Sequence, residues 1–288
     1  MTRGTAIDRP DVGNAWSTPL GAPLYPRYPI PFRDIEFLTL QYRTDPEAIR
    51  RLVPEPLEPT GDTVLLHVAR MGDVPGLGAE IHECNVMVGV RLDTAGGSIS
   101  GSYSPYFFLD SDRAIAQGRE VQGQPKRAAI VDLQVRGDLV VGTVVANGIE
   151  VLIGTLPYKQ QPASLDELRS RVDMVTNINL KIVPNMDGTI ALKQLVARDL
   201  QNVRVLECWS GPGTVELRPN AAVPLYRLPV LEFLDGYHWR AEFELVGGRV
   251  LHDYLENEAV RGAAGRDLDH VSAGSSRPSS TRSDSNRK

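Results

Sequence analysis

The stretch from residue 135 to 156, VRGDLVVGTVVANGIEVLIGTL, sets the strongest limit on the fold of this chain. Its β-branched and apolar residues fall into three runs, separated by the dipeptides Gly137-Asp138 and Asn147-Gly148. Such dipeptides are typical of two-residue hairpin turns, because they tolerate the positive φ angles that these turns need. The sequence therefore predicts three successive antiparallel strands joined by tight turns.

Apolar and polar residues alternate with a period of two along most of the chain, which is typical of half-buried strands. Further strands are predicted at 35–43, 63–71, 81–92 and 128–135, and later at 178–183, 190–196, 201–208, 214–217, 228–234 and 239–254. The pattern indicates an α+β fold that is mostly antiparallel β structure.

Helices are predicted to be few. Asp45 and Pro46 offer an N-cap and a first-turn proline for a helix that continues through Leu52. Ser164 to Glu167 has the spacing of a capping box, which predicts a helix to about Met174. A short helix is also expected over 112–118.

A single folded domain is predicted over residues 21–255, because no Pro/Gly/Ser-rich linker divides this region. Residues 1–20 are rich in Pro, Gly and Thr and are expected to form a flexible N-terminal segment. Residues 256–288 end in SAGSSRPSSTRSDSNRK, a polar low-complexity stretch that predicts a disordered tail.

Charge and composition exclude several classes of function. The net charge is −5 and the basic residues are scattered, so no nucleic-acid partner is expected. The N-terminus lacks the apolar core of a signal peptide, and no uncharged apolar run of about 18 residues predicts a membrane partner. Cys84 and Cys208 lie far apart, which suits a reducing compartment. We expect a cytoplasmic protein.

Lys126 lies in the segment 118–127, GREVQGQPKR, in a chain that has five lysines against 26 arginines. Lysine can lose its proton and act as a nucleophilic amine, which arginine cannot do. Arg127 beside it and the apolar run from Ala128 are the two influences, a nearby cation and removal from water, that destabilise an ammonium group. A pKa lowered by three units costs the charged form about 4 kcal/mol. The alternative is a solvated loop lysine beside a turn proline.

GREVQGQPKR, with SPYFFLDSDRAIAQ before it, resembles the active-site segment of the acetoacetate decarboxylase superfamily, in which Gly-Arg-Glu leads to Pro-Lys. Other stretches resemble the family in the same order: YRTDPEAIRRLVPEPLE (42–58), NINLKIVPNMDG (177–188), CWSGPGTVEL (208–217) and VLHDYL (250–255). The resemblance implies a mostly antiparallel cone or barrel, an oxo acid substrate, no cofactor and a homo-oligomer.

By this resemblance Lys126 is the Schiff-base lysine. Acetoacetate decarboxylase is itself the usual example of a lysine activated by a neighbouring cation. The family commonly has a second lysine in the next position, and Arg127 stands there in this chain. Arg127 is therefore expected to lower the pKa of Lys126.

The resemblance also implies other site residues. A family glutamate maps to Glu83, or to Glu80 if the register differs, and a second family glutamate aligns with His67. His67 is a candidate for acid-base chemistry or substrate binding, or is a core histidine. A family arginine that helps to hold the substrate matches Arg33 only with a two-residue slip.

Gln122 and Tyr254 are further candidates for substrate binding. The Gln122 amide could donate to a substrate carboxylate or hydroxyl, as in Schiff-base relatives that catalyse aldol condensation and dehydration. Tyr254 could donate a proton in the same pocket. Their alternatives are a turn-stabilising amide and a half-buried strand aromatic.

Metal and nucleotide cofactors are not expected. His82 and Cys84 would share one face of a strand, but no second pair of ligands accompanies them. The glycines form no dinucleotide or phosphate-binding fingerprint.

Three functions follow from these interpretations. The first is a lyase that decarboxylates a 3-oxo acid through a Lys126 imine, which the frequency of this reaction in the family favours. The second is an aldolase-dehydratase, dehydratase or cyclase that forms the same imine with pyruvate or another 2-oxo acid, which His67 and Gln122 favour. The third is a non-catalytic ligand-binding protein, which predicts an exposed or salt-bridged Lys126, whereas both enzymes predict a buried amine in a cavity.

Overall fold

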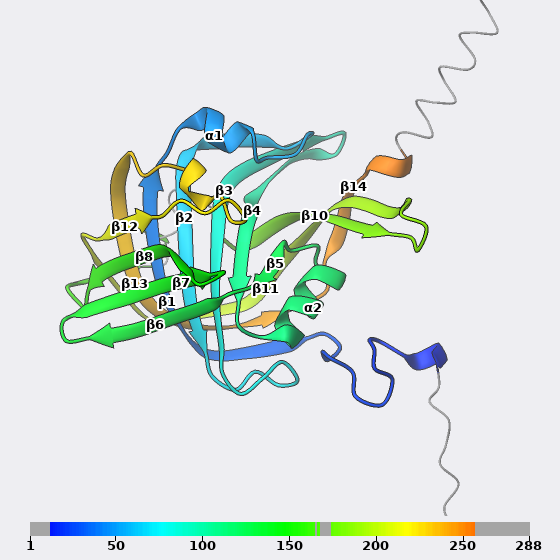
Figure 1. The fold of residues 1–288 in the computed structure, drawn as a ribbon, viewed down its shortest axis with the longest axis horizontal. Coiled ribbons are helices and arrows are strands. Elements are labelled where there is room, and N and C mark those ends of the chain that lie inside the picture. The colour runs from blue at the N-terminus through cyan, green and yellow to red at the C-terminus, as the bar shows by residue number, and fades with distance from the viewer. Residues whose placement is uncertain (1–11, 165, 168–173, 257–288) are drawn as a thin grey trace, which may run out of the picture.

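The computed structural model describes residues 12–164, 166–167 and 174–256. Strands dominate the described chain (Figure 1). They are β1 (Ile30–Arg43), β2 (Glu58–Met71), β3 (Ile81–Thr94), β4 (Gly97–Leu109), β5 (Lys126–Ala128), β6 (Ile130–Arg136), β7 (Leu139–Ala146), β8 (Ile149–Pro157), β9 (Gln161–Pro162), β10 (Thr176–Pro184), β11 (Ile190–Gly211), β12 (Thr214–Leu217), β13 (Glu232–Leu245) and β14 (Arg249–Asp253). The helices are η1 (Val12–Asn14), α1 (Pro46–Arg50), α2 (Asp112–Glu120) and η2 (Leu225–Arg227).

The main sheet has the strand order β10-β11-β13-β1-β2-β3-β4-β5 and is antiparallel except where β10 and β5 pair with β4. The pairing of β10 with β4 joins the first strand of this path to the last but one, at Asn177–Ser102 and Ile178–Tyr103. The sheet therefore curls into a cone, as expected, although it is not a barrel closed along its whole length.

A second sheet, β12-β8-β7-β6, packs on the outside of the cone (Figure 1). Its two hairpins confirm the predicted turns, because Arg136 pairs with Leu139 and Ala146 pairs with Ile149 across two-residue loops. The backbone φ is 53° at Asn147 and 76° at Gly148, as a mirror-image turn requires.

Alternation along the strands of the cone builds two separate cores. On β1, Leu38 and Leu40 face the second sheet and pack with Val68 of β2, whereas Phe37 faces the interior of the cone and packs with Leu65. Because successive side chains on a strand point to opposite faces, one strand serves both cores. The interior of the cone holds the candidate site.

The structure departs from the predicted strands at several places. β4 is not predicted, since its sequence GSISGSYSPYFFL is rich in the strand-breaking residues Gly, Ser and Pro. The predicted strands 190–196 and 201–208 form one continuous strand, β11. The predicted break at 235–238 lies inside β13, and the predicted strand 239–254 is divided between the end of β13 and β14.

Helices α1 and α2 lie where they were predicted. The capping box is present, because the backbone N–H of Glu167 donates to Ser164 Oγ and the backbone N–H of Ser164 donates to the Glu167 carboxylate. The predicted continuation of this helix falls largely on residues 168–173, outside the described residues. The predicted disordered tail lies almost entirely outside them too.

Candidate active site

A row of paired residues crosses the inner face of the cone and ends at Lys126. Strand register places Thr39 opposite His67, His67 opposite Asn85, Asn85 opposite Phe107, and Phe107 opposite Lys126. Paired residues in a sheet lie about 5 Å apart and point to the same face. The row thus brings residues from five strands to one wall of the interior.

Helix α2 and the turn after it present Lys126. An added Cβ at Gly118 would lie 2.7 Å from Lys126 Cε, so only glycine lets the lysine stem cross the helix there. Arg119 Nη1 donates to the Lys126 carbonyl oxygen at 3.2 Å, and the Tyr25 hydroxyl donates to Glu120 at 2.6 Å. Each residue of the Gly-Arg-Glu motif therefore has a structural role in holding the lysine or its helix.

A buried amide network fixes the turn that precedes Lys126. Gln124 Nε2 donates to Asn177 Oδ1 at 3.3 Å, and Asn177 Nδ2 donates to Ser104 Oγ at 3.0 Å. Asn179 Nδ2 also donates to Asn177 Oδ1, at 2.8 Å. Strands β10 and β4 thereby hold the turn in place.

The Lys126 side chain is buried, with 7% of the residue exposed. Its Nζ lies 3.9 Å from Glu83 Oε2 and 4.8 Å from the ring centre of Phe107. Burial lowers the pKa of Lys126 to about 8, although the Glu83 carboxylate opposes this shift. Burial raises the pKa of Glu83, while Lys126 and Arg198 act in the opposite direction. The site therefore holds an amine that is easily deprotonated beside a carboxyl that is easily protonated.

The cation that acts on Lys126 is Arg198 of β11, because its charge lowers the pKa of the lysine further. Arg127 follows Lys126 on β5, so its side chain takes the opposite face, where Nη1 donates to the carbonyl oxygen of Ala222 at 2.7 Å. The structure thus brings Arg198, and not the expected Arg127, to the lysine.

His67 lines the cavity in a fixed orientation. Its Nδ1 is 3.0 Å from Thr39 Oγ1, which also accepts the indole N–H of Trp239 at 2.9 Å. The Thr39 hydroxyl accepts from Trp239 and donates its own hydrogen to Nδ1 of His67, which places the ring hydrogen on Nε2. Burial, followed by the charge of Arg198, lowers the pKa of His67 to about 3. The imidazole is therefore neutral near pH 7 and offers an N–H donor.

The cavity encloses about 90 Å³ inside the cone. It brings together four of the predicted site residues, Lys126, Glu83, His67 and Gln122. Most of the remaining wall is apolar or aromatic. It consists of Phe32, Phe37, Met87, Phe107, Met174, Leu200, Val203, Trp239, Phe243 and Leu245, with Asn85, Gln124 and Arg198 as the other polar members.

Three other candidates lie elsewhere. Arg33 is on the outside of β1, 55% exposed and 3.9 Å from Glu244. Tyr254 packs against the core beneath the second sheet, and its hydroxyl donates to the carbonyl oxygen of Glu55. Glu80 is exposed and lies 3.8 Å from His82, so Glu83 is the glutamate that faces Lys126.

Sequence reasoning missed Arg198, Asn177 and Thr39. Thr39 and Arg198 are polar residues on inward faces that also carry Phe37 and Leu200, whereas Asn177 lies among the polar side chains of Ser102, Ser104 and Asn179. A charged or amide side chain at an inward position of a predicted strand is the signal that would have identified them.

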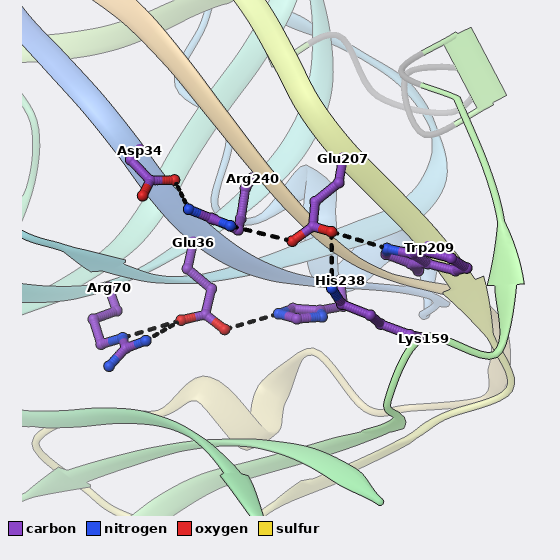
Figure 2. Close-up of polar contacts among 8 residues, drawn as sticks. All are labelled: Asp34, Glu36, Arg70, Lys159, Glu207, Trp209, His238 and Arg240. Atoms are coloured by element: carbon purple, nitrogen blue, oxygen red, sulfur yellow. Dashed lines mark hydrogen bonds and ion pairs between the residues drawn. The ribbon is translucent and has the colours of Figure 1, made fainter.

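A second cavity, of about 350 Å³, contains an ion-pair cluster outside the cone interior (Figure 2). Glu36 accepts hydrogen bonds from Arg70 and lies 2.9 Å from His238 Nε2, while Arg240 connects Asp34 with Glu207. These hydrogen bonds lower the pKa of Glu36 to about 2, with that to His238 as the largest cause. The charges in this cluster compensate one another.

The described parts of the chain contain no group of three or more His, Cys, Asp or Glu side chains that could hold a metal ion. None of the helices described is long and apolar enough to cross a membrane.

Comparisons with known proteins identify the family of this chain. The family model for acetoacetate decarboxylase matches residues 17–255. An acetoacetate decarboxylase from Burkholderia cenocepacia is 37% identical over 241 residues, which cover 84% of this chain and 96% of the relative. A Bordetella avium acetoacetate decarboxylase is 38% identical over 242 residues, which cover 84% of this chain and 96% of that one.

Solved structures give the same result. The crystal structure of acetoacetate decarboxylase from Legionella pneumophila has a TM-score of 0.77 and 31% identity, covering 88% of this chain and all of that one. The enduracididine biosynthesis enzyme MppR complexed with pyruvate shares the fold, with a TM-score of 0.71 and 21% identity over 83% of this chain and 98% of that one. Since the family model and the relatives span most of the chain, this protein belongs to the acetoacetate decarboxylase family.

Proposed function

We propose that this protein decarboxylates a 3-oxo acid through an imine on Lys126. The single observation that carries this proposal is the buried Lys126 amine, which faces a cavity and has a pKa of about 8. At pH 7 about one amine in ten is then free, against about one in three thousand at the ordinary lysine pKa. Relatives named acetoacetate decarboxylase support the same reaction.

In the proposed reaction the Lys126 nitrogen attacks the ketone carbon, and the oxygen leaves as water to give a protonated imine. The bond to the β-carboxylate then breaks, its electron pair moves into the imine, and carbon dioxide departs. The resulting enamine is protonated on carbon, and water cleaves the imine to release the ketone and the lysine. Glu83, 3.9 Å from Nζ, is placed to carry protons in these steps because its pKa is raised.

Reductive trapping tests this proposal. The protein is incubated with acetoacetate, reduced with sodium borohydride and digested, and the peptides are examined by mass spectrometry for an adduct on Lys126. Lys126→Arg is expected to lose both adduct and carbon dioxide release while remaining folded. Lys159→Arg is the matched control, since Lys159 lies outside the cavity and pairs with Glu207 at 2.9 Å. A wild-type protein that forms no adduct with a broad set of oxo acids would refute the imine.

The runner-up is an aldolase-dehydratase that acts on a 2-oxo acid. The observation in its favour is that neutral His67 and Gln122 both face the cavity, where they could donate to a hydroxyl or carbonyl group. The carboxylate of a 2-oxo acid is bonded to the imine carbon itself, so it cannot leave by the route above. Consumption of an aldehyde with pyruvate, without release of carbon dioxide, would select this reaction.

A non-catalytic ligand-binding protein is the third possibility. It predicted an exposed or salt-bridged lysine, whereas Lys126 is buried in a cavity and its distance to Glu83 is near the upper limit for an ion pair. This geometry supports the enzymatic alternatives.

We also propose a homo-oligomer that works in the cytoplasm. Exposed apolar residues at the end of the β10–β11 hairpin, Ile182, Met186 and Ile190, support an association between copies. The cysteines Cys84 and Cys208 are free and buried, as suits a reducing compartment. Light scattering after size-exclusion chromatography tests the oligomer, and fractionation of the producing cell tests the location.

A further inference from the structure

Arg198 is a half-buried residue with two buried side-chain nitrogens, Nε and Nη1, that have no hydrogen-bond partner among the residues that the structure describes. The side chain lines the cavity together with Leu200, which is on the same face of β11. The neighbouring Asp199 is on the other face, where it accepts hydrogen bonds from Thr176 and Arg249. Buried N–H groups without an acceptor are costly unless a ligand accepts from them.

We propose that Arg198 binds the carboxylate of the oxo acid inside the cavity, an inference that rests on the proposed imine at Lys126. Guanidinium groups bind carboxylates through paired N–H donors in a fixed planar arrangement, which explains why donors would be kept free here. No ion pair within 4.0 Å joins Arg198 to Glu83 in the described structure, so the nearby carboxyl does not occupy these donors.

The charge of Arg198 reaches the other polar groups of the cavity. It lowers the pKa values of Lys126, Glu83 and His67, as a positive charge does to every titratable neighbour. The same positive charge attracts an anion that enters the cavity. The apolar and aromatic wall provides no competing cation, and the carbon skeleton of a substrate can pack against it.

The resemblance had pointed to Arg33 for this role. Arg33 lies on the outside of β1 beside Glu244, away from the cavity. Arg198 comes from a strand more than 150 residues later in the chain, yet it is the arginine that lines the cavity with Lys126. The substrate carboxylate would therefore be held from β11.

The contact with Arg198 has a definite kinetic signature in a decarboxylase. The carboxylate loses its negative charge as carbon dioxide forms, so the contact is stronger with the bound substrate than in the transition state. Loss of this contact is then expected to raise KM without lowering kcat. An arginine with a purely structural role would not produce this split.

The test compares acetoacetate with acetoacetamide, an uncharged analogue that can form the same imine but cannot release carbon dioxide. KM is measured for acetoacetate, and the half-saturation concentration for borohydride trapping is measured for acetoacetamide. Because the same lysine reacts with both compounds, a change in its pKa affects both values and cancels in their ratio. Arg198→Met should raise KM for acetoacetate about 30-fold and change the value for acetoacetamide less than about 3-fold.

Arg198→Lys is the matched variant, since it keeps a positive charge but loses the paired donors. Its KM is expected to lie between those of the wild type and Arg198→Met. Urea unfolding checks that each variant folds, and Arg198→Met is expected to be at least as stable as the wild type because it removes two buried N–H donors that lack partners among the described residues. Equal shifts for acetoacetate and acetoacetamide, or no shift for either, would overturn the proposal.

A wild-type protein that is trapped by neither compound would refute the imine on Lys126 and leave Arg198 to a separate measurement. Calorimetric titration with butanoate and with butanamide needs no imine. Loss of butanoate binding in Arg198→Met, with butanamide binding unchanged, would still support the carboxylate site. Unchanged binding of butanoate would reject it.

Discussion

Lys126, which is buried, and Glu83, which is half-buried, are two ionisable groups whose reacting atoms, Nζ and Oε2, lie 3.9 Å apart. Burial lowers the pKa of the lysine and raises that of the glutamate, so it brings the two values toward each other. A smaller difference in pKa reduces the free energy needed to move a proton between the groups or through the substrate. The charges around this pair and those of the Glu36 cluster lead to measurable effects on reactivity and stability.

Glu83→Gln should lower the pKa of Lys126 below about 8, because the carboxylate opposes the effect of burial on the amine. The midpoint of the pH dependence of trapping with acetone should move to lower pH. Turnover should fall about 10²- to 10⁴-fold, as expected when a proton-transfer group is lost. Glu80→Gln, at an exposed position, is the control and should change neither measurement. Unchanged turnover in Glu83→Gln would exclude a catalytic role for this residue.

Lys126→Met should stabilise the protein near neutral pH. The pKa of Lys126 is about 8 in the folded protein and 10.5 in the unfolded chain, so the unfolded chain binds more protons between these values and stability rises with pH there. Below pH 8 the wild type carries the full cost of a buried ammonium, about 3 kcal/mol. Urea unfolding at pH 7 should show this gain for the variant, and the gain should vanish near pH 10.5.

Lys159→Met is the control for Lys126→Met, because the fold favours the ammonium form of Lys159. The hydrogen bond to Glu207 raises the pKa of Lys159, so its ammonium is favoured by the fold. This variant should gain no stability at pH 7. A similar gain in both variants would mean that the loss of any lysine stabilises the protein.

Gly118→Ala should impair the site without disrupting the fold. The new Cβ would lie 2.7 Å from Lys126 Cε and 2.8 Å from Gln124 Oε1, so the lysine stem has to move. A displacement of about 1 Å can cost roughly 100-fold in rate, which trapping rates would measure. Gly61→Ala, where nothing lies within 4 Å of the new atom, should react normally.

Thr39→Val should release His67 from its fixed tautomer. The variant keeps the shape of the side chain but leaves the Trp239 N–H and His67 Nδ1 without their shared partner, at a cost of about 1–3 kcal/mol for each group in urea unfolding. Nitrogen-15 NMR should show the Nε2–H form of His67 in the wild type and a mixture in the variant. Thr39→Ser retains the hydroxyl and should preserve both the tautomer and the stability.

Glu36→Gln should weaken the protein against urea above about pH 4.5 but not near pH 2. The pKa of Glu36 is about 2 in the fold and 4.5 in the unfolded chain, so its stabilisation is complete above pH 4.5 and is lost as the pH falls toward 2. Allowing for partial contact with solvent, this stabilisation is about 2 kcal/mol. Glu58→Gln, which affects an exposed pair with Arg50, should leave the pH profile of unfolding nearly unchanged.

The sequence was sufficient to predict the parts of the fold that depend on neighbouring residues. Hairpin dipeptides located β6, β7 and β8, and a first-turn proline located α1. β4 escaped prediction because its Gly, Ser and Pro residues disfavour a strand locally. It forms because β3 pairs with it along almost its full length.

The sequence motif was sufficient to identify Lys126. Residues that lie near Lys126 in space but far from it in the sequence could not be identified in this way. Arg127 was expected beside Lys126 because it is the next residue, but adjacent strand residues face opposite sides of a sheet. Arg33 lies within a β-bulge between Phe32 and Ile35, where Asp34 has a φ of 52°. A bulge changes which residues of a strand face inward, and the sequence gives little sign of it.

Arg198 belongs to a different strand from the amine whose protonation it influences. A substitution at this position leaves the turn that presents Lys126 untouched but alters the pH range in which the amine is free. If the same guanidinium also binds the substrate, residue 198 determines both the pH range in which the enzyme is active and its KM. Selection on either trait would then change the other, so an organism that adapts to a new internal pH could not adjust this enzyme at position 198 without also altering its affinity.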